Sequence, residues 1–134
     1  MQEKRTKAVL RITTPEDNAC FISDAMGIDA TKLEDKVEPK AGIVNMRMHE
    51  VSRWCLKSPL PDSSQLEEHL EFFVKLFASR KAHLLTIRHR IKKIDAFCMF
   101  SSISGQGSME LNSELLAHLA KHGIDVIIDL YPPE

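Results

Sequence analysis

Alternating apolar and polar residues at both ends of the chain are the feature that most constrains its fold. Residues 7–13 read KAVLRIT and residues 124–131 read IDVIIDLY, with an apolar residue at every second position. A period of two sends successive side chains to opposite faces of a β-strand, so both segments predict half-buried strands. The chain is therefore expected to begin and end in a sheet, with its helices in between.

Two further segments have strand character. Residues 94–101, IDAFCMFS, alternate in the same way, and Ala96, Cys98 and Phe100 share the face that is expected to be buried. Residues 43–58, IVNMRMHEVSRWCLKS, contain no internal turn signal, so one bent strand and a pair of strands both remain open.

The glycines of SISGQGSMELN, residues 102–112, bear on how the chain continues after the strand at residues 94–101. A Walker-type phosphate loop needs a lysine and a following helix, and a dinucleotide-binding loop needs a third glycine. This stretch has neither the lysine nor the third glycine, and two glycines between alternating segments suit a hairpin turn. We therefore predict a hairpin whose second strand is residues 108–111.

Capping residues and periodic apolar stripes predict the helices. Thr14 is expected to cap a first helix that ends at Gly27, and residues 32–40 are interpreted as a charged loop. A capping box from Ser64 to Glu67 begins the clearest helix. Its apolar stripe, spaced at four, three and four residues, consists of Leu66, Leu70, Phe73 and Phe77.

The order of the elements predicts the fold class. Two further helices, over residues 80–92 and 112–123, complete the order β-α-β-αα-β-β-α-β. At 134 residues the chain is expected to be a single domain, residues 1–134. We predict an α+β fold with a mostly antiparallel sheet of about five to six strands, helices packed on one face, and a layout related to ferredoxin-like folds.

The composition limits the classes of function. The formal net charge is −1, so no overall field attracts nucleic acid or an anionic membrane. Three cysteines without a C-x-x-C pair predict neither a disulfide framework nor a zinc site. No apolar run approaches membrane-spanning length, and the N-terminal residues lack an apolar leader segment. We expect a soluble, cytoplasmic protein that carries no cofactor and does not associate with membranes.

One helix edge carries side chains that can ligate metals. Glu114, His118 and His122 follow one another at intervals of four residues, but the sequence offers no obvious fourth ligand. We interpret them as a solvated helix edge and predict no metal site. Cys98 is expected to be a buried thiol rather than a nucleophile, and no catalytic residue is predicted.

One basic cluster stands out in a chain of otherwise mixed charge. No acidic residue interrupts it, and it consists of Arg80, Lys81, Arg88, Arg90, Lys92 and Lys93. It could contact phosphates or an acidic protein surface, and the alternative is a solvated helix face. The negative net charge and the lack of an aromatic RNA-binding strand argue against nucleic acid.

The face of the sheet opposite the helices is the predicted partner-binding surface. Its apolar centre is framed by charged side chains, a composition typical of contact surfaces. The residues predicted to bind a protein partner or a second copy of the chain are Val9, Arg11, Phe97, Met99, Ile127 and Tyr131. The alternative is that residues 43–49 or a chain terminus cover this face.

Several motifs resemble a bacterial domain-of-unknown-function family, number 4279. They are W-x-L-x-S at residues 54–58, LEEHLEFF at residues 66–73, G-x-x-E-L-N-S-E-L-L at residues 107–116 and IDLYPPE at residues 128–134, together with LRIT at residues 10–13 and MGIDAT at residues 26–31. The resemblance implies a small bacterial cytoplasmic domain with no assigned activity, and it offers no catalytic residues to carry over.

The leading hypothesis is a non-catalytic interaction module, and a toxin-neutralising immunity protein is a specific form of it. A second class is a small-molecule binder or hydrolase that uses a histidine with Ser101, Ser102, Ser104, Ser108 and Glu110. A third is nucleic-acid binding through the basic cluster.

Overall fold

Five strands form one open, mixed sheet in the computed structural model, which describes residues 4–37, 51–102 and 108–131. The strands are β1 (Lys4–Thr14), β2 (Lys32–Val37), β3 (Val51–Lys57), β4 (Lys93–Ser102) and β5 (Asp125–Tyr131). Their order across the sheet is β2-β3-β1-β4-β5. Among these described strands only the β4–β5 pair is parallel, so the sheet is mostly antiparallel, as predicted.

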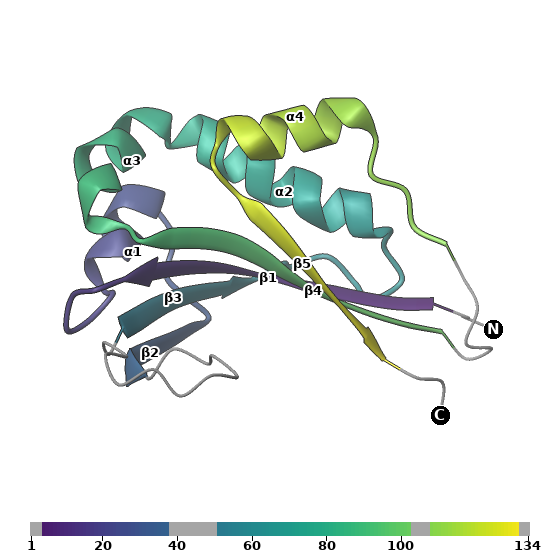
Figure 1. Ribbon diagram of the computed structural model, residues 1–134, viewed down its shortest axis with the longest axis horizontal. Coiled ribbons are helices and arrows are strands. Elements are labelled where there is room, and N and C mark those ends of the chain that lie inside the picture. The colour runs from purple at the N-terminus through teal and green to yellow at the C-terminus, as the bar shows by residue number, and fades with distance from the viewer. Residues whose placement is uncertain (1–3, 38–50, 103–107, 132–134) are drawn as a thin grey trace, which may run out of the picture.

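All the helices of the described chain lie on one side of this sheet (Figure 1). They are α1 (Phe21–Met26), α2 (Leu66–Ser79), α3 (Lys81–Ile87) with the 3-10 turn η1 (Arg88–Arg90), and α4 (Ser113–Lys121). The helix α2 packs against the central strand β1, α4 packs beside α2, and α1 packs beside α3. The predicted α+β class is confirmed.

The core lies between the helices and the sheet. The predicted stripe of α2 is buried throughout, with Leu66, Leu70, Phe73 and Phe77 at most 2 % exposed. It packs against the inward row of the sheet, which includes Leu10, Ile12 and Trp54. The indole N–H of Trp54 donates a hydrogen bond of 2.9 Å to Ser23 Oγ, which ties α1 to β3.

The predicted hairpin after β4 is wrong in its second strand. Residues 108–111 form no strand, and the tip at residues 103–107 lies outside the described residues. The chain instead continues into α4 and returns as β5, parallel to β4. Parallel neighbours cannot be joined by a tight turn, so the helix supplies the crossover. The cap of α4 is as expected, because Asn112 Oδ1 accepts the amide of Leu115 at 2.8 Å.

Two predictions near the N-terminus are corrected. Thr14 does not cap a helix, because β1 runs through it and pairs it with Ser52 of β3. The helix α1 begins only at Phe21, although it ends at Gly27 with φ of 69°, as predicted. Residues 32–37 are not a loop but the edge strand β2, whose charges suit an edge that faces water.

Smaller differences concern the ends of elements. The capping box of α2 lies one residue later than predicted, because Gln65 is the cap and its backbone N–H donates to Glu68 Oε1 at 2.8 Å. The strand-like segment at residues 43–58 is seen as β3 from Val51 onward. The question of a second strand falls on residues 43–50, which lie outside the described residues.

Candidate functional site

The face of the sheet that bears no helix carries a row of apolar side chains. Register pairs align Val9 with Phe97 and Phe97 with Ile127, so these three side chains cross β1, β4 and β5 side by side. Met99 lies two residues further along β4, and Tyr131 lies on the same face of β5. We call Val9, Phe97, Met99, Ile127 and Tyr131 the outer apolar row.

Exposure distinguishes the members of this row. Tyr131 is 50 % exposed, and the other members are partly exposed. All six residues predicted to bind a partner therefore lie on one face, with Arg11 at one end of the row. The alternation of the strands brought them together, because side chains two residues apart on a strand share a face.

An ion pair with a buried carboxylate lies at one end of the row. Arg11 Nε donates to Asp95 Oδ1 at 2.7 Å, and only 4 % of the Asp95 side chain is exposed. The guanidinium of Arg11 also lies 4.5 Å from the centre of the Phe97 ring, within the range of cation–π attraction. Asp95 was not singled out from the sequence, although its position two residues before Phe97 places it on this face.

The other end of the row is hollowed. A depression of about 160 Å³ is lined by Arg5, Lys7, Met99, Phe100, Ser101 and Tyr131. Known small-molecule pockets measure roughly 300–1,000 Å³, so this depression suits one side chain of a partner better than a whole ligand. Arg5 and Lys7 supply positive charge at its rim.

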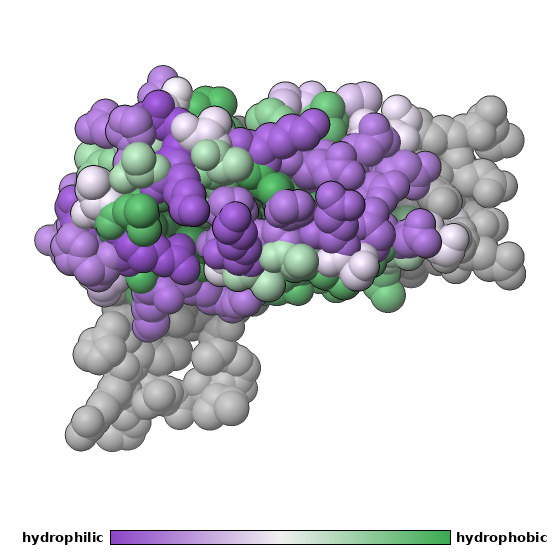
Figure 2. Space-filling view, turned by 90° about the horizontal axis from the view of Figure 1, so that it is seen from above, coloured by the Kyte–Doolittle hydropathy of each residue, from purple (hydrophilic) through white to green (hydrophobic). Residues whose placement is uncertain are grey.

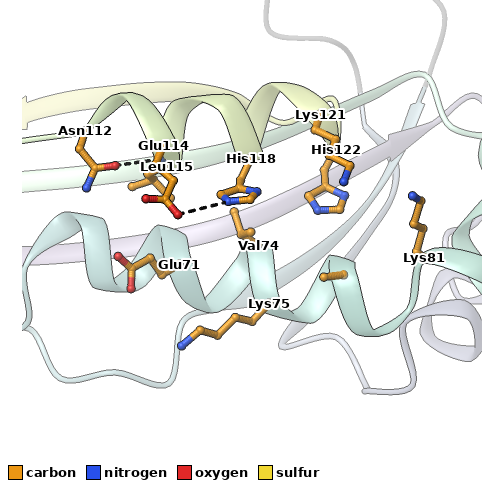
Figure 3. A pocket seen from close by; sticks show the side chains of 11 residues that line it. Glu71, Val74, Lys75, Lys81, Asn112, Glu114, Leu115, His118, Lys121 and His122 are labelled. Atoms are coloured by element: carbon orange, nitrogen blue, oxygen red, sulfur yellow. Dashed lines mark hydrogen bonds and ion pairs between the residues drawn. The ribbon is translucent and has the colours of Figure 1, made fainter.

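The opposite side of the molecule is mainly hydrophilic (Figure 2). A groove of about 540 Å³ runs between α2 and α4 on that side (Figure 3). Glu71 and Glu114 lie at one end of the groove, and Lys81, Lys121 and His122 lie at the other.

The histidines of this groove lie on the helix edge that carries Glu114, His118 and His122. His118 Nε2 lies 3.9 Å from Glu114 Oε1, and both side chains are at least half exposed. The ring of His122 packs edge-on against Phe77, and burial, with the nearby charges of Lys121 and Lys81, lowers its pKa. Within residues 4–37, 51–102 and 108–131, no three metal-ligating side chains are grouped closely enough to hold an ion.

The basic cluster is divided among several structural contacts. Arg80 donates to the carbonyl of Ala25 at 2.9 Å, and Arg88 occupies the space where a Cβ at Gly123 would lie. Arg90 forms two hydrogen bonds with Glu16, one of 2.6 Å, and lies 3.7 Å above the Phe21 ring. This contact holds the pKa of Glu16 below its usual value. Lys81, Lys92 and Lys93 are exposed.

The serines proposed for a hydrolytic site are spread over both faces of the sheet. Ser101 pairs with Tyr131 on the outer face, whereas Ser102 is buried on the face that carries the helices. Ser108 and Glu110 follow in the segment without regular structure, and Ser104 lies outside the described residues. Adjacent residues of a strand point to opposite faces, so Ser101 and Ser102 cannot act on one substrate.

The cysteines of β3 and β4 are buried. Burial raises the pKa of Cys98 to about 12. Burial, together with the Glu34 carboxylate, raises that of Cys55 to about 11. Such pKa values favour the protonated thiol near neutral pH. Cys98 is 0 % exposed in the hydrophobic core, so its predicted burial is confirmed.

A histidine and a serine are paired in the core. His69 is 1 % exposed, and its Nδ1 lies 2.7 Å from Ser58 Oγ. Its other ring nitrogen, Nε2, is buried and has no side-chain hydrogen-bond partner among the residues that the structure describes. Burial lowers the pKa of His69, because the charged ring would lose its hydration.

Acidification is therefore expected to destabilise the protein. The unfolded chain binds a proton at His69 once the pH falls below the usual value of 6.5, whereas the folded chain binds it only at lower pH. The contribution of His69 to the free energy of unfolding should thus be constant above pH 6.5 and should decrease as the pH falls below 6.5. Urea denaturation between about pH 7.5 and pH 5 measures this slope. The variant His69→Leu should show a clearly smaller slope, and an unchanged slope would contradict the assignment.

No helix in the described part of the chain is long and apolar enough to cross a membrane. The fold is an open α+β sheet with helices on one face and an apolar row on the other.

Residues 4–133 match the family model of a domain of unknown function, DUF4279, and the chain belongs to this family. The resemblance drawn from the sequence motifs is thereby confirmed at the level of the family. No curated protein and no solved structure matches the chain.

Proposed function

We propose that this chain is a non-catalytic interaction module that binds a protein partner through the outer apolar row. The observation that carries the proposal is the continuity of the row. Side chains from three adjacent strands meet on one face, and no helix of the described chain packs over them. Burial of the outer apolar row against a partner removes apolar surface from water, which favours binding.

The chemistry of the face supports a protein as the partner. Interface cores are enriched in aromatic residues, methionine and arginine, and Phe97, Tyr131, Met99 and Arg11 supply all of these. Lys7 and Asp129 flank Met99 and form a charged rim around the apolar centre. The depression at Tyr131 can accept one anchoring side chain.

The free thiols support a reducing cytoplasm as the place of action. Cys20, Cys55 and Cys98 form no disulfide with one another. Unpaired cysteines are usual where glutathione keeps thiols reduced. These free thiols are consistent with the proposed action of the module in the cytoplasm of a bacterium.

A photo-cross-linking amino acid at Met99 tests the proposal. In cells that produce the chain, we expect a discrete adduct with a partner protein from position 99. The same amino acid at Leu85 is the control, since Leu85 is 66 % exposed on α3 and lies on the other side of the sheet. The cross-linked protein is then identified by mass spectrometry and produced in pure form.

Calorimetry with the purified partner measures the contribution of the row. The variant Met99→Asp should weaken binding by about 30-fold or more, as expected for a buried contact residue at an interface. The variant Leu85→Asp should leave the affinity unchanged. Equal adducts from both positions, or equal affinities of both variants, would contradict the proposal.

A further inference from the structure

The two edges of the sheet differ in how well they resist a further strand. The edge strand β2 carries the charged residues Lys32, Glu34 and Asp35, and its register with β3 shifts after Glu34. Charges and register shifts are common means by which edge strands avoid pairing with another chain. The strand β5 contains no lysine, and its register with β4 runs from Asp125 to Tyr131 without a shift.

The strand β5 also exposes apolar side chains at this edge of the sheet. Ile128 and Leu130 share the face that carries the helices, because they pair with Cys98 and Phe100. They are nevertheless 38 % and 67 % exposed, so the helix layer leaves them open to water. By contrast Ile124, the residue just before β5, is only 4 % exposed, so this face is well buried only where the strand begins.

The helix α4 continues this apolar surface. Leu116 is 46 % exposed and lies on the side of α4 opposite His118, which lines the groove toward α2. It therefore faces away from α2, the neighbour on the groove side. In Figure 2, apolar colour shows along part of the lower edge, which is the side that faces the reader in Figure 1.

We propose that β5 pairs antiparallel with β5 of a second copy of the chain, about a twofold axis through Ile128. Two five-stranded sheets would then continue as one. This inference goes beyond the proposed function, since it uses the edge of the sheet rather than the outer apolar row.

The positions of the aspartates select this register. With the axis at Ile128, Val126 faces Leu130 of the second copy and Ile128 faces its own counterpart. Asp125 then faces Tyr131, and Asp129 faces Ile127, so no carboxylate lies directly opposite another. An axis one residue earlier would set Asp125 opposite Asp129, and an axis one residue later would set Asp129 opposite its own copy. Like charges directly opposite each other destabilise a strand pair.

The geometry of the pairing places the helices of both copies on the same side. Antiparallel pairing at an edge needs a twofold axis perpendicular to the sheet, and such an axis preserves the two faces. The helix α4 then lies near the α4 of the second copy, and Leu116 of each faces the axis. The interface therefore extends from the strand to the helix layer.

Light scattering at protein concentrations from about 1 to 300 µM tests the pairing, because the dissociation constant of a small interface of this kind is expected to fall in that range. We expect a dimer whose dissociation constant rises at least about tenfold in Leu130→Lys, because the lysine would lie in the apolar seam. The matched control is Leu85→Lys, since Leu85 is 66 % exposed on α3, away from the edge. This control should dimerise as the unmodified chain does.

Cross-linking tests the register. Exposed Cys20 is first replaced by serine. In this background Ile128→Cys should form a covalent dimer with a short thiol cross-linker, because the two thiols face each other. Val126→Cys should not, because its two copies would lie about 13 Å apart along the strands.

The outcomes separate this inference from the proposed function. The variant Met99→Asp should leave the dimer intact, because Met99 lies on the outer face of β4 and not at the edge. A monomer at every concentration would overturn the pairing. A dimer that Met99→Asp dissolves and Leu130→Lys does not would also overturn it. Efficient cross-linking through position 126 rather than 128 would overturn the register.

Discussion

Replacing Phe73 by alanine is expected to lower the free energy of unfolding by about 3–5 kcal/mol. Phe73 is 0 % exposed at the centre of the α2 stripe, where it packs in the core between the helices and the sheet. Its removal takes apolar surface out of the core and leaves a cavity that neighbouring helices can fill only in part. Stabilities of domains are often only 5–15 kcal/mol, so the variant should unfold at much lower urea concentration.

The fluorescence of Trp54 is a suitable probe for this measurement. It is the only tryptophan of the chain and is fully buried, so unfolding exposes it to water. The control variant Leu85→Ala removes a similar side chain from an exposed position and should change stability by no more than about 0.5 kcal/mol. Equal losses in the two variants would show that α2 does not form the core described above.

Replacing Arg11 by methionine is expected to cost about 3 kcal/mol of stability. The substitution leaves the Asp95 carboxylate buried without its cation, and an uncompensated buried charge is strongly unfavourable. It also removes the cation–π contact with Phe97. Urea denaturation near neutral pH measures the change.

The double variant Arg11→Met with Asp95→Val separates the effect of the uncompensated charge on stability from the effect of lost packing. When both charges are replaced by apolar groups, no buried ion remains, and most of the lost stability should return. A double-mutant cycle gives the interaction energy of the pair. If the double variant were as unstable as the sum of the two single variants, the two side chains would act independently, against the observed contact.

Local patterns along the chain predicted much of the fold. The alternation at residues 7–13 and 94–101 corresponds to β1 and β4, and the stripe at Leu66 and Phe73 corresponds to α2. These elements follow from a period of two or of 3.6 residues, which each segment carries by itself. The glycine stops at Gly27 and Gly123 were predictable for the same reason, because a positive φ is a local requirement.

Pairing between distant segments could not be predicted in the same way. The charged residues of β2 show no alternation of apolar side chains, and they form a strand only because β3 supplies hydrogen bonds. The predicted strand at residues 108–111 failed because β5, rather than the segment next in sequence, lies beside β4. The sequence also does not distinguish a threonine such as Thr14 at the end of a strand from one that caps the start of a helix.

The candidate site likewise combines features that the sequence predicts with features that only the tertiary structure shows. The sequence by itself determined which side chains share a face, so Val9, Phe97, Met99 and Tyr131 were placed together correctly by alternation alone. Only the tertiary structure decided that Arg11 pairs with Asp95, that the arginines at 80 and 90 are engaged in packing, and that β5 is left at an edge. Side-chain direction is set by neighbouring backbone geometry, whereas strand order and ion pairing depend on residues far apart in the chain.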